Sequence, residues 1–197
     1  GVFIATPALT FLQLAETLTV PALVLLGLEL CGTYVSDDGR FIRSKPLTSK
    51  DALTQYVSDH SGERGAAKAL EALRYIADNS ASPRESQLVA LLCLPRKWGG
   101  YGFPMPLLNE RIDLTTQQQR VLGKNHLRCD LLWPGAQLAI EYDSDTFHAG
   151  ATKINNDSLR RNVLRSTGIT VIDITNTQLK KAEAFHETAI QVDHCLG

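Results

Sequence analysis

Three carboxylates lie close together in a stretch whose pattern predicts a β-hairpin. Asp130 precedes a Trp-Pro-Gly turn, and Glu141 and Asp143 follow it. Apolar and polar residues alternate on both sides of the turn, which is typical of two half-buried strands. A four-residue loop at 134–137 would place Asp130 opposite Glu141 on the polar face. Because carboxylate oxygens are the ligands that Mg²⁺ prefers, this hairpin is a candidate metal site.

The chemistry expected at such a site is hydrolysis. A bound Mg²⁺ can activate a water molecule and neutralise the charge that develops on a phosphodiester. His148 follows Asp143 just beyond the predicted strand and is a candidate general acid or base. The simpler interpretation is that Asp130 is only solvated at a strand end. Three carboxylates converging on one face favour the metal site.

Composition limits the classes of partner. A formal net charge of −1, with 44% hydrophobic and 21% charged residues, is typical of an ordinary soluble globular protein. Any contact with DNA must therefore come from a local basic patch. The four cysteines are widely spaced and form no CxxC pair, which indicates neither a zinc ribbon nor a disulfide framework. Reduced cysteines in a cytoplasmic protein are the simplest expectation.

The N-terminal stretch is apolar but is not expected to enter a membrane. Gln13, Glu16 and Glu29 interrupt it, and no basic segment precedes it, so it predicts neither a signal peptide nor a membrane span. The chain starts on Gly-Val-Phe-Ile, which has the character of a strand interior. We therefore expect a fragment of a longer protein.

Local signals divide the chain into a helical region, 1–80, and an α/β domain, 81–197. Thr6-Pro7, Thr19-Val20-Pro21, other capping residues and apolar periodicity predict helices in the first region. The segment 32–46 is either a small hairpin or a loop. The second region predicts a central mixed sheet flanked by helices. Its expected elements are a helix from Ser82, irregular chain at 95–106, a strand within 107–121, the hairpin, a helix at 150–167, a buried strand at 169–174 and a closing helix from Asn176.

A combination of motifs resembles the PD-(D/E)XK nuclease superfamily, and most closely the small bacterial proteins related to very-short-patch repair endonucleases. The motifs are Ser82-Pro83-Arg84-Glu85, Arg128-Cys129-Asp130-Leu131-Leu132-Trp133-Pro134, Glu141-Tyr142-Asp143-Ser144 with His148, Asp157 with Arg160 and Asn162, and Gly168. The resemblance covers roughly residues 80 to 180. It implies a restriction-endonuclease-like core, with Asp130 and Glu141 as ligands of Mg²⁺ or Mn²⁺ and Glu85 completing the acidic cluster. A glutamate in the first turn of a helix can also simply complement the helix dipole.

The sequence departs from the superfamily pattern at the catalytic lysine. Asp143 occupies that position, and Ser144 replaces the glycine usual in this branch. Water activation would then fall to His148, to Lys153 or to the metal alone. The cysteines and histidines do not form the structural zinc site of the repair enzymes. The N-terminal helical region resembles the segment that joins such domains to a winged helix in some abortive-infection, antitoxin-like proteins.

Two functions therefore compete. The first is a metal-dependent DNA endonuclease or nickase, and the second is a DNA-binding or regulatory module, defence-associated, that keeps the fold without the chemistry. The basic residues expected to hold phosphates are Arg128, Lys153, Arg160 and Arg161. Joint presence of Glu85, Asp130, Glu141 and His148 favours the enzyme, whereas the missing lysine and the near-neutral charge favour the binding module.

Overall fold

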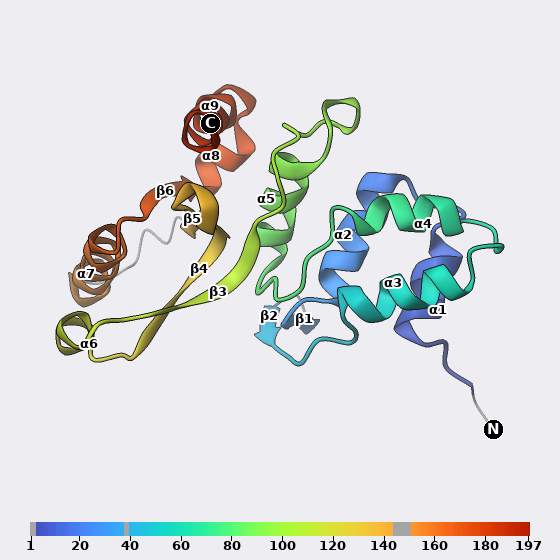
Figure 1. Ribbon diagram of the computed structural model, residues 1–197, viewed down its shortest axis with the longest axis horizontal. Helices are drawn as coiled ribbons and strands as arrows, with labels where there is room; N and C mark the ends of the chain where they lie inside the picture. The colour runs from blue at the N-terminus through green and yellow to red at the C-terminus, as the bar shows by residue number, and fades with distance from the viewer. Residues whose placement is uncertain (1–2, 38–39, 144–150) are drawn as a thin grey trace. The chain divides into compact units, whose positions relative to one another are not determined.

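The computed structural model describes residues 3–37, 40–143 and 151–197, without the side chains of 36, 37, 40 and 151–158 (Figure 1). The chain forms two compact units, 1–105 and 106–197. The helix Pro83–Cys93 belongs to the first unit because it packs on the helix Val20–Leu30. The division into units thus lies beyond the boundary expected between residues 80 and 81.

The first unit is mainly helical. Its helices are α1 (Pro7–Leu14), α2 (Val20–Leu30), α3 (Lys50–Asp59), α4 (Ala66–Leu73) and α5 (Pro83–Cys93), followed by the 3₁₀ turn η1 (Arg96–Trp98). Thr6, Thr19 and Ser82 cap α1, α2 and α5, each with a proline in the first turn. This arrangement satisfies free N–H groups at the helix start with a side-chain oxygen and places proline where its missing N–H costs nothing.

The segment 32–46, for which sequence left a hairpin or a loop open, contains a hairpin. Strands β1 (Tyr34–Asp37) and β2 (Arg40–Arg43) pair antiparallel. The next helix, α3, is capped by Ser49 and carries Asp51 in its first turn. The sequence predicted Thr48 as the cap of this helix and an end near Asp59, so the helix start was located to within one residue.

The second unit is α/β, with a mixed sheet flanked by helices, as the sequence predicted. Its elements are β3 (Leu107–Asp113), α6 (Thr116–Leu122), β4 (His126–Trp133), η2 (Pro134–Ala136), β5 (Leu138–Asp143), α7 (Ala151–Ser166), β6 (Thr170–Thr175), α8 (Asn176–Lys180) and α9 (Ala182–Leu196). Among the described residues the sheet has four strands in the order β3-β4-β5-β6. Only β5 and β6 pair in parallel, because the crossover through α7 returns the chain in the same direction.

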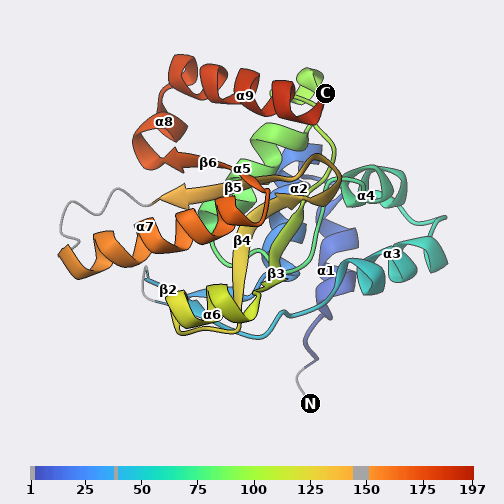
Figure 2. The same ribbon diagram turned by 60° about the vertical axis from the view of Figure 1, so that its left-hand side comes forward.

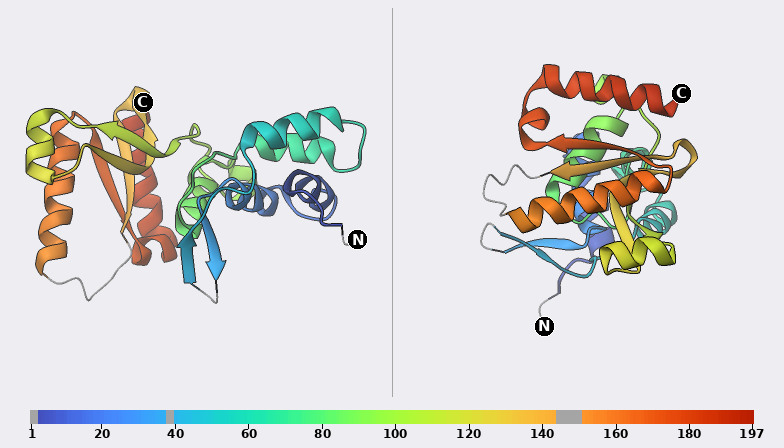
Figure 3. Two further views of the ribbon diagram at one scale, coloured as in Figure 1. Left: turned by 90° about the horizontal axis from the view of Figure 1, so that it is seen from below. Right: turned by 90° about the vertical axis from the view of Figure 1, so that its left-hand side faces the viewer.

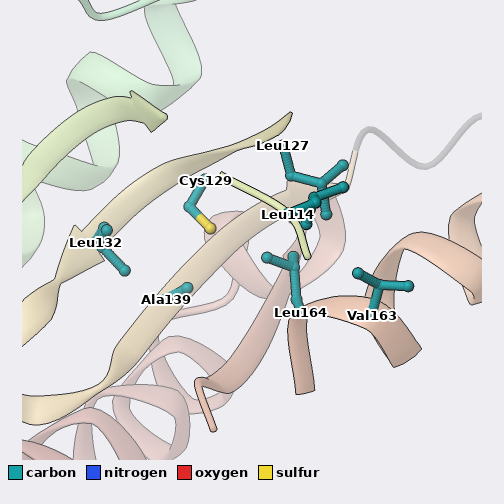
Figure 4. Close-up of a cluster of buried hydrophobic side chains, with 7 residues drawn as sticks. All are labelled: Leu114, Leu127, Cys129, Leu132, Ala139, Val163 and Leu164. Carbon is teal, nitrogen blue, oxygen red and sulfur yellow. The ribbon is translucent and has the colours of Figure 1, made fainter. Parts of the chain in front are cut away.

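Helices lie on both faces of this sheet. Figure 3 shows α7 and α9 on opposite sides of the strands, and α9 contacts β5 and β6. Beneath α7, buried side chains from both hairpin strands meet the helix in one cluster (Figure 4). The cluster consists of Leu114, Leu127, Cys129, Leu132, Ala139, Val163 and Leu164. This packing positions α7 against β4 and β5.

Two expectations for this unit were wrong in part. The strand expected from 107 to 121 begins at Leu107 but ends at Asp113, and Thr116–Leu122 is helical because Thr115 and Gln118 form a reciprocal capping box. The apolar strand β6 was expected to be covered on both faces, but it lies at the sheet edge and only Ile174 is fully buried. In the part of the chain that is described, no helix is long and apolar enough to cross a membrane.

Candidate functional site

The β4–β5 hairpin has the register that the sequence predicted. The paired residues are Leu131 with Ile140, Leu132 with Ala139, and Trp133 with Leu138. Continuing this register by one position places Asp130 opposite Glu141. Asp130 Oδ2 accepts a hydrogen bond from the backbone N–H of Tyr142 at 2.8 Å, so this carboxylate spans the two strands at the point where the backbone pairing stops.

The neighbouring strand β3 is also irregular at this level. Asn109 lies between the β3–β4 pairs that flank Asp130, and its φ is 50°, outside the extended region. Cys129 and Leu132 both belong to the cluster beneath α7. In a regular strand, residues three positions apart would point to opposite faces. Strict alternation along β4, which the sequence suggested, therefore fails near Asp130. The local irregularity brings Asp130 toward the end of β5.

Glu141 is buried beneath α7. It shares a face of β5 with Ala139, because alternate residues of a strand point the same way, and Ala139 packs with Val163 and Leu164 of α7. The glutamate is only 7% exposed. Sequence alternation had suggested a half-buried strand with a polar face, but Leu138 through Glu141 are all buried because helices cover both faces.

Arg160 of α7 holds this buried carboxylate. Its Nη1 donates to Glu141 Oε2, and its Nη2 donates to the backbone carbonyl of Arg128. One guanidinium therefore connects α7 with both strands of the hairpin. Arg160 was expected to contact phosphate from an exposed helical flank, but the structure directs it inward, since burial of Glu141 requires a compensating charge.

One oxygen of Glu141 has no partner among the described residues. Oε1 is buried and accepts no hydrogen bond there. Burial raises the pKa of the Glu141 carboxyl, while the hydrogen bond and charge of Arg160 oppose that rise. Burial, the charge of Glu141 and a side-chain hydrogen bond to Glu141 raise the pKa of the Cys129 thiol to about 12, against the charge of Arg160, so the thiol stays protonated at neutral pH and is a weak donor beside the carboxylate. A buried carboxylate oxygen that receives no N–H or O–H donor favours an added cation.

The donors at the hairpin end fit a hard divalent cation. Asp130 and Glu141 offer carboxylate oxygens from adjacent strands, and Mg²⁺ commonly takes one or two carboxylates and completes its shell with water and phosphate oxygens. Asp143 is exposed at the end of β5, where it pairs in register with Thr175. Within the described ranges, no three His, Cys, Asp or Glu side chains are grouped closely enough to hold a metal by themselves.

Glu85 lies in the first unit and acts within its own helix. Its Oε2 accepts from Ala81 N–H and its Oε1 accepts from the Ser82 hydroxyl, both at 2.8 Å, while Ser82 Oγ accepts from Glu85 N–H. This is a capping arrangement at the start of α5. The local role that sequence kept open is therefore present, and membership of an acidic cluster with Asp130 stays a prediction.

The remaining predicted site residues divide into two groups. Arg128 is exposed and donates to the Asn109 carbonyl at 2.6 Å, and Arg161 pairs with Asp173 at 3.5 Å. Both lie in the second unit. The candidate base His148 and the side chain of Lys153 lie outside the described residues.

Asp173 is a polar residue of this region that sequence reasoning missed. It pairs in register with Glu141 across the parallel β5–β6 ladder, and its charge contributes to the raised pKa of Glu141. The available signal was one aspartate inside an otherwise apolar strand, ITVIDI. Such a residue is expected to have a charged partner, and Arg161 is that partner.

Comparisons with known proteins give distant relatives only. The chain is 26% identical over 133 residues to two uncharacterised proteins of Mycobacterium tuberculosis, one from strain H37Rv and one from strain CDC 1551. The matched region is 68% of this chain and 44% of each relative, so the chain spans less than half the length of the curated relatives it matches. No family model and no solved structure matches.

Proposed function

We propose that this chain is a metal-dependent DNA endonuclease or nickase with a restriction-endonuclease-like core. The observation that carries the proposal is the buried Oε1 of Glu141, which receives no N–H or O–H donor from the described residues, on a residue that lies opposite Asp130 when the β4–β5 register is continued by one position. Two carboxylates on adjacent strands, one with an unsatisfied oxygen, provide the donors that Mg²⁺ or Mn²⁺ prefers. DNA as partner and the cytoplasm as location remain predictions from the sequence.

In this function each residue has a distinct task. Asp130 and Glu141 bind the cation, which when bound would activate water and neutralise charge on a phosphodiester. Arg160 fixes the Glu141 carboxylate from one side and leaves Oε1 for the metal. Exposed Arg128 contributes positive charge beside the hairpin for a phosphate group. Asp130, tied to Tyr142 N–H, keeps its position before any ligand binds.

The second candidate is a DNA-binding or regulatory module without catalysis. The observation that favours it is the ion pair between Arg160 and Glu141, which already neutralises the buried carboxylate without any metal. Asp143 in place of the superfamily lysine points the same way, since it removes the usual group for water activation.

Asp130→Asn separates the two functions. Asparagine keeps the acceptor for Tyr142 N–H but removes a charged metal ligand, so the fold should persist while Mg²⁺-dependent plasmid nicking is lost. The parent should gain thermal stability with Mg²⁺ or Mn²⁺, and the variant should gain less. Asp193→Asn, at an exposed position of α9, is the matched control and should behave as the parent does.

Three outcomes decide the matter. Loss of nicking in Asp130→Asn with an unchanged melting temperature in metal-free buffer supports the enzyme. Equal nicking by parent and variant rules out the hairpin as its site. A parent that neither nicks DNA nor gains stability from either metal overturns the enzyme and leaves the binding module.

A further inference from the structure

A groove between α6 and α7 lies outside the residues assigned so far. Its volume is about 450 Å³, within the range of small-ligand sites. Val121, Leu159 and Val163 give it apolar walls, while Thr115, Gln117 and Asn162 add hydroxyl and amide groups. Figure 2 shows the two helices side by side. We call these residues the amide groove.

The groove is held in shape from within. Gln118 donates through Nε2 to Ser166 Oγ at 2.9 Å, while its Oε1 accepts from Thr115 N–H at 2.9 Å. Leu159 and Val121 nevertheless remain 41% and 53% exposed. Gln117 and Asn162 are exposed as well. A fixed hollow therefore presents both apolar surface and amide groups to solvent.

Cations outnumber anions in the segments that form the groove. Residues 113–129 contain three Lys or Arg and one Asp, and residues 157–173 contain three Arg and two Asp. Arg120 follows Gln117 by three positions, and Arg165 follows Asn162 by three, so each cation is a surface neighbour of a groove amide. Lys124 lies two residues after the end of α6. Arg120, Lys124 and Arg165 are exposed and make no ion pair with any described residue.

The groove is also close to the candidate metal site along α7. Leu159, a groove residue, directly precedes Arg160, whose guanidinium reaches Glu141. Val163 belongs both to the groove and to the cluster beneath α7. A helix rises ~1.5 Å per residue, so Arg160 and Val163 are separated by only ~4.5 Å along the axis.

We propose that the amide groove binds one unpaired base of a DNA strand, with Arg120, Lys124 and Arg165 contacting the flanking phosphates. An uncharged, flat group with hydrogen-bonding edges matches apolar walls and amides, and a polyanion matches the surrounding cations. An anionic lipid surface would match the cations but would not use the amides. The inference rests on the proposed DNA-cleaving function and specifies that its substrate is a strand with an unstacked nucleotide near the cleaved bond.

Two single-stranded probes test the groove in buffer containing EDTA, where binding is measured without cleavage. One is an all-thymine oligonucleotide, and the other is the same length with abasic sugars, so the phosphates are equal and only the bases differ. The parent should bind the thymine strand roughly 5-fold or more tightly, which is the effect of about one net hydrogen bond to a base edge. The double variant Gln117→Ala, Asn162→Ala should lose that preference.

Charge and control variants complete the test. The triple variant Arg120→Ala, Lys124→Ala, Arg165→Ala should weaken both probes alike and flatten the salt dependence, because phosphates are common to both. Gln191→Ala, an exposed glutamine of α9, should retain the parent's preference. All substituted side chains are exposed, and circular dichroism melting should be unchanged.

The outcomes separate this inference from the proposed function. Equal affinity of the parent for both probes, or a base preference that survives loss of the two amides, overturns the groove as a base site. Binding to phosphatidylserine vesicles but to neither oligonucleotide also overturns it. A base preference without metal-dependent nicking would support the groove as a base site and overturn the nuclease function. Nicking without a base preference would support the nuclease function and overturn the groove as a base site.

Discussion

Two buried glutamates differ in how their charge is accommodated. Glu85 at the start of α5 and Glu141 at the end of β5 are each 7% exposed. Glu85 receives hydrogen bonds from Ala81 N–H and the Ser82 hydroxyl, both within four residues in sequence. Glu141 is held by Arg160, nineteen positions away, and its Oε1 remains without a partner among the described residues.

The difference shows that burial alone does not identify a functional carboxylate. A cap satisfies its glutamate through local donors that the start of the helix holds in place. A carboxylate satisfied on one oxygen only, by a distant arginine, keeps capacity for a further ligand. If the two carboxylates differ in this way, substitutions at each of them should affect different parts of the chain.

The largest effect is expected for Arg160→Ala. Removing one partner of a buried pair leaves an uncompensated charge and should lower the free energy of unfolding by ~3 kcal/mol or more. Hydrogen exchange should accelerate at the amides of β4 and β5 and stay unchanged in α5. The control is Arg161→Ala, whose pair with Asp173 is about one-third exposed and should contribute less than ~1 kcal/mol. Equal effects of the two variants would contradict a special role for Arg160.

A smaller effect, confined to the first unit, is expected for Glu85→Ala. Loss of the cap should cost about 1 kcal/mol, and hydrogen exchange should accelerate at the start of α5 but not in β4 or β5. Plasmid nicking should be unchanged if the cap is its whole role. A variant that folds with parental stability but loses nicking would restore Glu85 to the acidic cluster that the sequence predicted.

A pH series distinguishes Glu141 further. Because burial raises its pKa above the ordinary 4.5, the folded protein takes up this proton before the unfolded chain does. Stability of the metal-free parent relative to Glu141→Gln should therefore increase as pH falls through the raised pKa and level off below 4.5. Chemical denaturation at several pH values measures it. A parent that loses stability relative to the variant over this window would show that Arg160 outweighs burial.

The smallest effect is expected for the alkylation rates of two buried cysteines, one in each unit. Burial raises the pKa of Cys93 in α5 and of Cys129 in β4 to about 12, so neither should react with iodoacetamide at pH 8 in the folded parent. In Arg160→Ala, Cys129 should become reactive sooner than Cys93. Mass spectrometry of the alkylated peptides gives both rates at once. Equal rates would indicate that the two regions open together.

The sequence by itself determined the elements whose causes are local. Ser82-Pro83 located α5 because capping and proline geometry act within one turn. Alternation around the Trp-Pro-Gly turn located the hairpin and its register, since the loop length sets which residues oppose each other. The mixed sheet followed from the crossover before β6. The signal for α6 was local as well, because Thr115 and Gln118 form a capping box at its start.

Only the tertiary structure decided which faces are covered and which charges meet. The alternating strand β5 is buried on both faces and the apolar strand β6 lies at the edge, because strand order depends on contacts distant in sequence. The same packing turns Arg160 from a predicted phosphate contact into the partner of Glu141. Residue types fixed which chemistry is possible, whereas the desolvation that leaves one Glu141 oxygen unpaired arises only when α7 packs on the sheet.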